Sequence, residues 1–321
     1  MKAAVLVNPF AGGADAKETI CSAINGFLQD CTVFSSLEFG GALIRATLHV
    51  NEDAGDYRDR LFSTVDKLAA QEPDFYLVAG GDGFAAYIAD RLLKTRHKNP
   101  KIVGVAMGTA NVGPIVSFSA EALIDAKLEQ LVFSDCGAIE AFDGERSLAY
   151  GFNDIVLGNT ILGTVEGKPQ PISARAMVQE GKKLPEAPLA QIGRSLAVTK
   201  NGLRSNVPLE RVSQIVISAV ERERLYGRAV TGMLCFTCWQ QAHAALLFSE
   251  RPLVVVDYDP RGFETPALCA QMVFGEEDEV TLSGLVPEAL VIADGNPYLR
   301  SFESVTLRYR PGVIQTANLV K

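Results

Sequence analysis

The first 135 residues alternate apolar runs of strand length with longer amphipathic stretches, and this alternation restricts the possible folds more than any other feature. Strands separated by helices are typical of βαβ units, which build a mainly parallel sheet covered by helices. We therefore expect an α/β domain with a doubly wound sheet. The expected strands are residues 3–7, 32–35, 74–78 and 101–106, with 42–50 as a further candidate, and the expected helices are residues 14–28, 57–70, 85–94 and 120–131.

After residue 134 the pattern changes to short β-like runs separated by glycine, proline and asparagine. Such runs are typical of antiparallel sheets. A chain of 321 residues has room for two domains. We expect an α/β domain over residues 1–134 and a mainly antiparallel β domain over 135–321, and the end of the chain can return to the first domain. The expected strands of the second domain are residues 136–142, 152–157, 214–219, 231–238, 253–258, 279–282, 289–292 and 304–309.

Composition excludes several classes of partner and location. The net charge is −8, from 38 acidic and 30 basic side chains, so the field of the protein repels polyanions and disfavours nucleic acid as a partner. The longest apolar runs, such as residues 3–7, are far shorter than the roughly 20 residues that cross a bilayer, so we expect no membrane span. The start of the chain lacks a signal-peptide pattern, and the six cysteines are scattered. We expect a cytoplasmic protein with reduced thiols.

The strand at 74–78 leads into a turn with three glycines and one carboxylate, Gly80, Gly81, Asp82 and Gly83, before a helix pattern begins. Glycines permit positive φ and a close approach of phosphate to the backbone, and the N-terminus of the following helix attracts anions. A carboxylate beside phosphates is unfavourable unless it binds Mg²⁺ or takes a proton from an attacking hydroxyl. We therefore interpret Asp82 as a catalytic residue of phosphoryl transfer. Its alternative role, as a helix N-cap, would not require three glycines.

Two further strands end in turns of the same kind, residues 8–13 and 107–113. In an open parallel sheet, such turns gather at the carboxyl edge of the strands, where ligands bind. The Walker pattern and the GxGxxG fingerprint are both absent, so a nucleotide site of another kind is indicated. The candidate phosphate-binding and nucleotide-binding residues are Asn8, Gly12, Gly13, Gly80, Gly81, Gly83, Gly108, Thr109 and Asn111.

The segments NPFAGG (8–13), GGDG (80–83) and MGTAN (107–111) resemble, in order and spacing, the shared motifs of NAD kinases and of diacylglycerol and sphingosine kinases. The segment YGFNDIVL (150–157) is similar to the asparagine-acidic motif of NAD kinases, and ALVIADG (289–295) to a late Asp-Gly turn of both families. The resemblance implies an NAD kinase-like fold, with a cleft between an α/β domain and a β domain. It also implies ATP and Mg²⁺ as cofactors, a small-molecule acceptor, and a homodimer or homotetramer.

By this resemblance, Asp82 activates the acceptor hydroxyl, the glycines line the phosphates, and Asn8 and Asn111 orient phosphate or ribose. Asn153 and Asp154 hold the acceptor. An NAD(H)-like acceptor suits them, because a carboxylate can accept hydrogen bonds from a ribose diol and an amide can contact an amide or a base. No residue is assigned as a metal ligand.

The sequence departs from both branches of the superfamily. Phe84 stands where NAD kinases usually have threonine, Asp154 stands where they have glutamate, and residues 231–239 lack their GSTAY segment. Lipid kinases follow GTxN with aspartate and an aromatic residue, whereas Val112, Gly113 and Pro114 stand here. This pattern resembles the relatives of NAD kinase that are grouped with acetoin-catabolism proteins. Three alternatives stay open: a lipid kinase, a catalytically inactive nucleotide-binding regulator, and polyphosphate as the phosphoryl donor.

Overall fold

The computed structural model of the chain describes residues 1–95, 98–107, 113–165, 168–184, 196–220, 243–252, 266, 268–286, 289–298 and 303–319. The chain separates into two compact units. The first comprises Met1–Gly137 and Pro311–Lys321, and the second comprises Ala138–Arg310. The sequence pattern changes three residues before the first unit gives way to the second. The last residues of the chain belong to the first unit.

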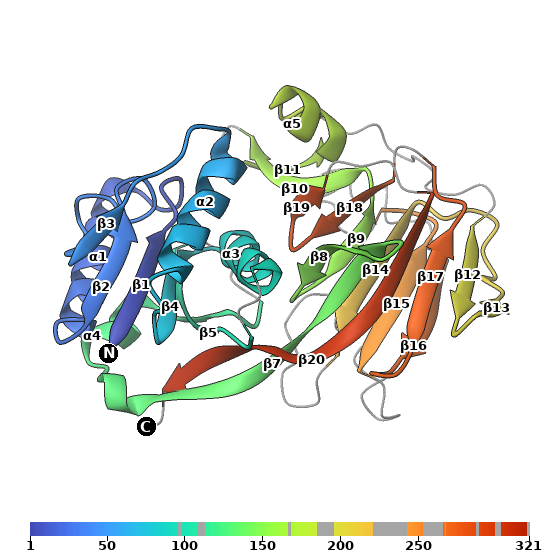
Figure 1. Ribbon diagram of the computed structural model, residues 1–321. Coiled ribbons are helices and arrows are strands. Elements are labelled where there is room, and N and C mark those ends of the chain that lie inside the picture. Colours follow the sequence, from blue (N-terminus) through green and yellow to red (C-terminus); the bar gives the residue numbers. More distant parts are fainter. Residues whose placement is uncertain are drawn as a thin grey trace. The chain divides into compact units, whose positions relative to one another are not determined.

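The first unit is built on parallel strands in the order β5-β4-β1-β2-β3. Figure 1 shows these strands with their helices, in which α1 packs against α4, and α2 against α3. The strands are β1 (Lys2–Val7), β2 (Thr32–Ser36), β3 (Leu48–Val50), β4 (Phe75–Gly80) and β5 (Lys101–Ala106). The helices are α1 (Ala14–Phe27), α2 (Tyr57–Ala69), α3 (Asp82–Lys94) and α4 (Ala120–Ile124). The predicted parallel α/β domain is confirmed.

Both faces of the central strands are buried, which explains why their sequences are continuously apolar. Val5 and Leu77 pack with Ile24 of α1 in one core cluster. The alternate residues Leu6 and Val78 are also fully buried. Strands covered on both faces lose the alternation of apolar and polar residues that marks half-exposed strands.

Two predicted elements of the first unit are wrong in extent. The predicted helix 120–131 ends at Ile124, and the chain then passes through a 3-10 turn (Leu128–Gln130) into strand β7 (Leu131–Asp143). The side chains of Leu128 and Leu131 pack against the core from this non-helical path, so the apolar spacing that suggested a helix is satisfied without one. The candidate strand at 42–50 is reduced to β3, since turns occupy the residues before it.

The second unit contains a six-stranded sheet in the order β16-β15-β14-β9-β18-β19, and every pair is antiparallel. This arrangement confirms the predicted antiparallel β domain. Its strands are β9 (Ile155–Gly158), β14 (Gln214–Ala219), β15 (Ala244–Ser249), β16 (Cys269–Phe274), β18 (Leu290–Ala293) and β19 (Asn296–Tyr298). The predicted strands at 231–238 and 253–258 lie outside the described residues.

The second unit has further described elements, which precede or follow the strands of this sheet along the chain. A hairpin of β10 (Thr160–Val165) and β11 (Lys168–Ser173) precedes helix α5 (Ala174–Glu180). Further strands are β8 (Arg146–Gly151), β12 (Ala197–Lys200), β13 (Leu203–Ser205) and β17 (Glu279–Ser283). The long strand β20 (Ser304–Leu319) pairs with β17 through residues 304–308 and with β5 through Gln315 and Thr316.

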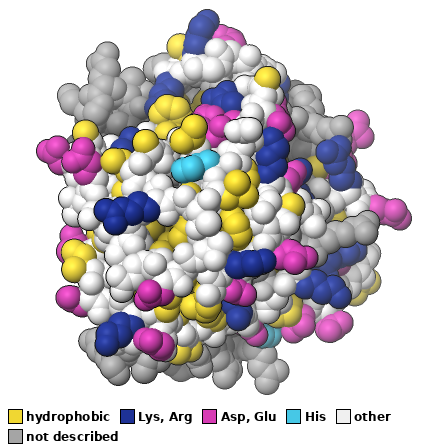
Figure 2. Space-filling view, turned by 60° about the vertical axis from the view of Figure 1, so that its left-hand side comes forward, with side chains coloured by type: hydrophobic (Ala, Val, Ile, Leu, Met, Phe, Trp, Pro, Cys, Tyr) yellow, Lys and Arg dark blue, Asp and Glu magenta, His cyan; other side chains and the backbone are white. Residues whose placement is uncertain are grey.

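Charge is distributed in small groups on the face drawn in Figure 2. Basic and acidic side chains alternate there, and among the side chains described on this face the basic ones form no continuous surface. None of the helices in the described part of the chain has the length and apolar character required to cross a membrane.

Candidate functional sites in the two units

Three turns of the first unit meet at one edge of its sheet. In the parallel register, Val7 of β1 lies beside Ala79 of β4, and Gly80 lies beside Ala106 of β5. The backbone N–H of Asn8 donates to the carbonyl oxygen of Ala79 at 2.8 Å, and that of Met107 donates to Gly80 at 3.1 Å. The first residues of all three turns are therefore neighbours. Gly108, Thr109 and Asn111 of the third turn lie outside the described residues.

The first turn, residues 8–13, has a tightly constrained backbone. The Asn8 side-chain oxygen accepts a hydrogen bond from the Phe10 N–H at 3.0 Å. Gly12 has a φ of +68°, a conformation that other residues adopt only with strain. A Cβ at Gly12 would lie 3.7 Å from the Met107 methyl carbon, which brings this turn next to the third. Gly13 is the N-cap of α1. Because glycine has no side chain, it cannot accept a hydrogen bond from the first N–H groups of the helix as a serine or aspartate cap would.

None of the three glycines of the second turn has a positive φ, so this part of the prediction is wrong. Gly81 caps α3 with extended backbone (φ −96°, ψ 173°), and Gly83 lies in the first turn of the helix. A Cβ at Gly80 would lie 2.7 Å from the Phe84 ring, so the ring occupies the space that a side chain at 80 would need. Phe84 also stacks on Phe39, with ring centroids 6.4 Å apart.

Asp82 is the first residue of α3, and the N-cap of this helix is Gly81 rather than Asp82. Its carboxylate oxygen Oδ2 instead accepts a hydrogen bond from the backbone N–H of Gly113 at 2.9 Å. Asp82 is only 9% exposed. A Cβ at Gly113 would lie 3.0 Å from the carboxylate carbon, so a glycine at 113 gives the carboxylate room. The second and third turns are thus joined through the residue that we interpret as catalytic.

Gly113 is a site residue whose role the sequence does not reveal. It follows the GTAN segment and precedes Pro114, and this Gly-Pro pair is the only signal that the sequence offers. The edge of the sheet therefore combines a buried carboxylate with the N-termini of α1 and α3, both capped by glycine, and the N-terminus of a helix attracts anions. This combination suits a ligand with negative oxygens and an ionisable hydroxyl.

In the second unit, the turn between β8 and β9 carries Asn153 and Asp154, both buried. A single carboxylate binds its backbone. Asp294 Oδ2 accepts from the Phe152 N–H at 2.8 Å, and Oδ1 accepts from Asn153 at 2.7 Å and from Asp154 at 3.0 Å. The Asp294 N–H in turn donates to the Asp154 carbonyl oxygen at 2.9 Å. The late Asp-Gly turn is visible in the sequence, but its link to residues 153 and 154 is not.

The environment of Asp294 favours its neutral form. Burial, and then the negative charge of Asp154, raise the pKa of Asp294 from its ordinary 3.8 to about 7, although the three N–H donors act in the opposite direction. A proton on Asp294 at neutral pH would reduce its repulsion with Asp154.

A pH dependence of stability follows. The folded protein holds the Asp294 proton more tightly than the unfolded chain, so the contribution of this group to the free energy of unfolding is fully present below pH 3.8 and is lost as the pH rises through about 7. The Asp294→Asn variant has no proton to lose at this position. We therefore expect the free energy of unfolding of the wild type to fall, relative to that of Asp294→Asn, as the pH rises from about 5 to about 8. Urea denaturation at both pH values measures it. A shift in the opposite direction would mean that the N–H donors keep the carboxylate ionised.

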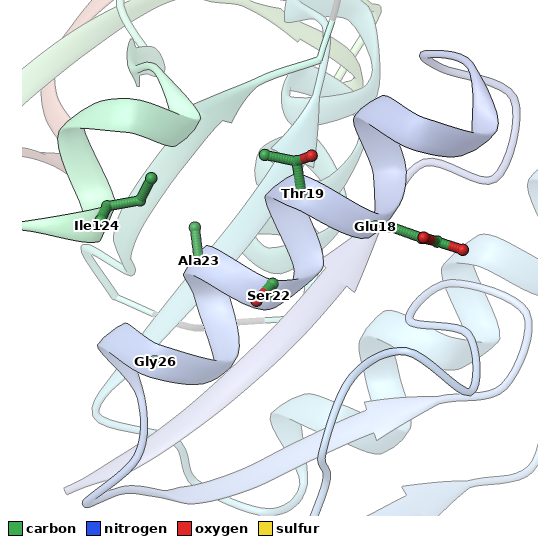
Figure 3. Close-up of a pocket in the computed structure, with 6 residues that line it drawn as sticks. All are labelled: Glu18, Thr19, Ser22, Ala23, Gly26 and Ile124. Carbon is green, nitrogen blue, oxygen red and sulfur yellow. The ribbon is translucent and has the colours of Figure 1, made fainter.

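The hollow drawn in Figure 3 lies elsewhere in the first unit. Side chains of α1 and Ile124 of α4 line it, and it contains none of the residues of the three turns. Its lining residues are Glu18, Thr19, Ser22, Ala23, Gly26 and Ile124. It therefore does not contribute to the candidate site.

Comparison with known proteins agrees with this architecture. Residues 2–135 match the family model of the diacylglycerol kinase catalytic domain. An uncharacterized protein of Archaeoglobus fulgidus is 25% identical over 230 residues, which cover 70% of this chain and 67% of that protein. The crystal structure of yeast NADH kinase complexed with NADH superposes with a TM-score of 0.52 at 10% identity, covering 100% of this chain and 84% of that one.

In its fold and in residues 2–135, the chain is similar to members of the superfamily that contains NAD kinases and diacylglycerol kinases, which its motifs also resemble. The segment that matches the kinase catalytic domain includes the GGDG turn with Asp82.

Proposed function

We propose that the protein is an ATP-dependent kinase that transfers the γ-phosphoryl group to a hydroxyl of a small molecule, with an NAD(H)-like dinucleotide as acceptor. One observation carries the proposal: the buried Asp82 carboxylate, held by the Gly113 N–H, lies at the sheet edge where three glycine turns meet. A carboxylate in such surroundings is useful when it removes a proton from a hydroxyl that attacks phosphorus.

The first unit would bind the phosphoryl donor. The N–H groups in the first turns of α1 and α3 would donate to phosphate oxygens, with their positive helix ends favouring the negative charge. Asn8 would orient phosphate or ribose. The remaining residues that we assign to the nucleotide are Gly12, Gly13, Gly80, Gly81 and Gly83, together with Gly108, Thr109 and Asn111 outside the described residues.

Mg²⁺ fits this assignment through its usual protein contacts, one or two carboxylates together with substrate phosphates. Asp82 can supply one such oxygen. In the part of the chain that the structure describes, no group of three or more His, Cys, Asp or Glu side chains is arranged to hold a metal. A bound Mg²⁺ would neutralise charge on the phosphates of the transferring group.

The second unit would bind the acceptor through Asn153 and Asp154. An aspartate can accept two hydrogen bonds from a ribose diol, and the asparagine amide can both donate and accept. Asp154 is shorter than the glutamate of NAD kinases by one methylene group, so the acceptor hydroxyl would have to lie closer to the backbone of residue 154 to contact the carboxylate. The product of such a reaction on NAD would be NADP.

An acceptor screen tests the proposal. We expect the purified full-length protein to transfer labelled phosphate from ATP, in the presence of Mg²⁺, to NAD or NADH. Polyphosphate in place of ATP identifies the donor, and nucleosides and sugars are the comparison acceptors. Binding of ATP without transfer to any acceptor would contradict the proposal and favour a nucleotide-binding regulator.

A lipid kinase is the second candidate, and the match of residues 2–135 to the diacylglycerol kinase catalytic domain favours it. The same screen distinguishes the two, because vesicles containing diacylglycerol serve as one of its acceptors. Labelled lipid without labelled dinucleotide would replace the NAD(H) acceptor by a lipid while retaining the kinase. In either case we propose a homodimer or homotetramer, which sedimentation of the purified protein measures.

A further inference from the structure

Asp294 lies in a two-residue hairpin turn between β18 and β19, where Asp294 has a φ of +49° and Gly295 a φ of +78°. Positive φ at both positions is typical of tight hairpin turns, in which Asn-Gly, Asp-Gly and Gly-Gly are all common. The turn alone therefore explains a residue that tolerates positive φ. It does not explain a carboxyl group that is only 6% exposed, because asparagine or glycine would form the same turn without burying an ionisable group.

The bonding pattern of the carboxylate supplies the explanation. The two oxygens of Asp294 accept from three consecutive N–H groups, those of Phe152, Asn153 and Asp154. The backbone of the same turn is also fixed from β14, since the Ser218 hydroxyl donates to the Asn153 carbonyl oxygen at 2.6 Å. The backbone of residues 152–154 is thus fixed from two sides.

We propose that Asp294 is a positioning residue for the acceptor: it fixes the backbone of the 152–154 turn and thereby sets the orientation in which Asn153 and Asp154 bind the dinucleotide. This inference rests on the proposed function and adds a residue that lies 140 positions from the turn that it holds. A side chain whose backbone is fixed in the binding conformation loses less freedom when the ligand arrives.

Two substitutions distinguish the role of the Asp294 carboxylate from the role of residue 294 in the hairpin turn. Asp294→Gly preserves the hairpin, because glycine adopts positive φ freely, but it leaves three N–H groups without their acceptor. We expect it to raise the KM for NADH by about 10-fold or more, from the loss of the three hydrogen bonds that fix the turn, and to change the KM for ATP by less than about twofold. Asp294→Asn retains one acceptor oxygen, so its effect on the KM for NADH is expected to be smaller.

Asp278→Asn is the matched control. Its carboxylate also holds a turn of the second unit, between β16 and β17, where it accepts from the Gly275 N–H at 2.7 Å and pairs with Lys200 at 2.8 Å. We expect this variant to leave both KM values unchanged. All variants are measured as full-length protein by steady-state kinetics, by fluorescence titration with NADH in the absence of ATP, and by hydrogen exchange of the amides of residues 152–154.

Faster exchange of these amides in Asp294→Gly, together with weaker NADH binding and an unchanged KM for ATP, would support the inference. Unchanged exchange, or faster exchange with unchanged NADH binding, would overturn it while leaving the proposed function intact. A wild type that neither binds nor phosphorylates NADH would overturn the proposed acceptor and, with it, the role of Asp294 in holding that acceptor. The two failures are distinguishable, because one is seen in the variant and the other in the wild type.

Discussion

Asp82→Asn is expected to lower phosphoryl transfer by about 10³-fold, the middle of the range for loss of a general base. The substitution removes the negative charge and the capacity to accept a proton, but it preserves the size of the side chain and an oxygen that can accept from the Gly113 N–H. The fold should therefore be intact. Turnover of labelled ATP with the best acceptor measures the loss, and circular dichroism and thermal unfolding verify the fold.

The control for this experiment is Asp66→Asn in the same unit. Asp66 lies on α2 and pairs with Arg91 of α3, half-exposed and remote in sequence from the three turns. A half-exposed ion pair contributes little to stability, so this variant should retain full turnover. If Asp82→Asn were as active as Asp66→Asn, the role of Asp82 in catalysis would have to be abandoned.

Gly104→Ala is expected to lower the free energy of unfolding by about 3 kcal/mol or more, because the added methyl group meets backbone on a neighbouring strand. Gly104 lies in β5 where β6 (Val116–Phe118) pairs with it. A Cβ at this position would lie 2.7 Å from the carbonyl carbon of Ile115 and 2.8 Å from the Cα of Val116, and it would also overlap the Ile115 oxygen. No change of side-chain rotamer relieves these contacts. Urea denaturation measures the loss.

For Gly26→Ala, in the same unit, we expect the opposite effect on the free energy of unfolding. Gly26 lies near the end of α1, and a Cβ there would meet no atom within 4 Å. Alanine in a helix is favoured over glycine by about 1 kcal/mol, so this variant should be slightly more stable than the wild type. Equal effects of the two substitutions on the free energy of unfolding would contradict the packing at Gly104.

The elements of the first unit were predictable because its strands and helices differ in local period. The strand predicted at 101–106 has the bounds of β5, and the helix predicted at 57–70 ends one residue beyond α2. The helix predicted at 120–131 was wrong because apolar residues at three and four spacing also fit the extended chain after Ile124, where tertiary packing decides between the two. Local period cannot distinguish them.

The candidate site was predictable only where its residues are close in sequence. The GGDG turn is visible at once, since three glycines surround one carboxylate. The contact of Asp82 with Gly113 spans 31 residues and that of Asp294 with Asp154 spans 140, and neither leaves a local signal. Positive φ was the wrong explanation for Gly80, because the position of the Phe84 ring becomes visible only once the helix is placed.

The contact between Gly80 and the Phe84 ring makes these two positions a single packing unit. The ring fills the space that a methyl group at 80 would occupy. A larger side chain at 80 therefore requires a smaller one at 84. A shorter side chain at 84, such as threonine, would remove the ring atom that lies 2.7 Å from a Cβ at 80 and would leave the Cβ of residue 84 at 3.2 Å. A redesign of this edge of the sheet should therefore change residue 84 before residue 80, because a side chain added at 80 beside the Phe84 ring would overlap it.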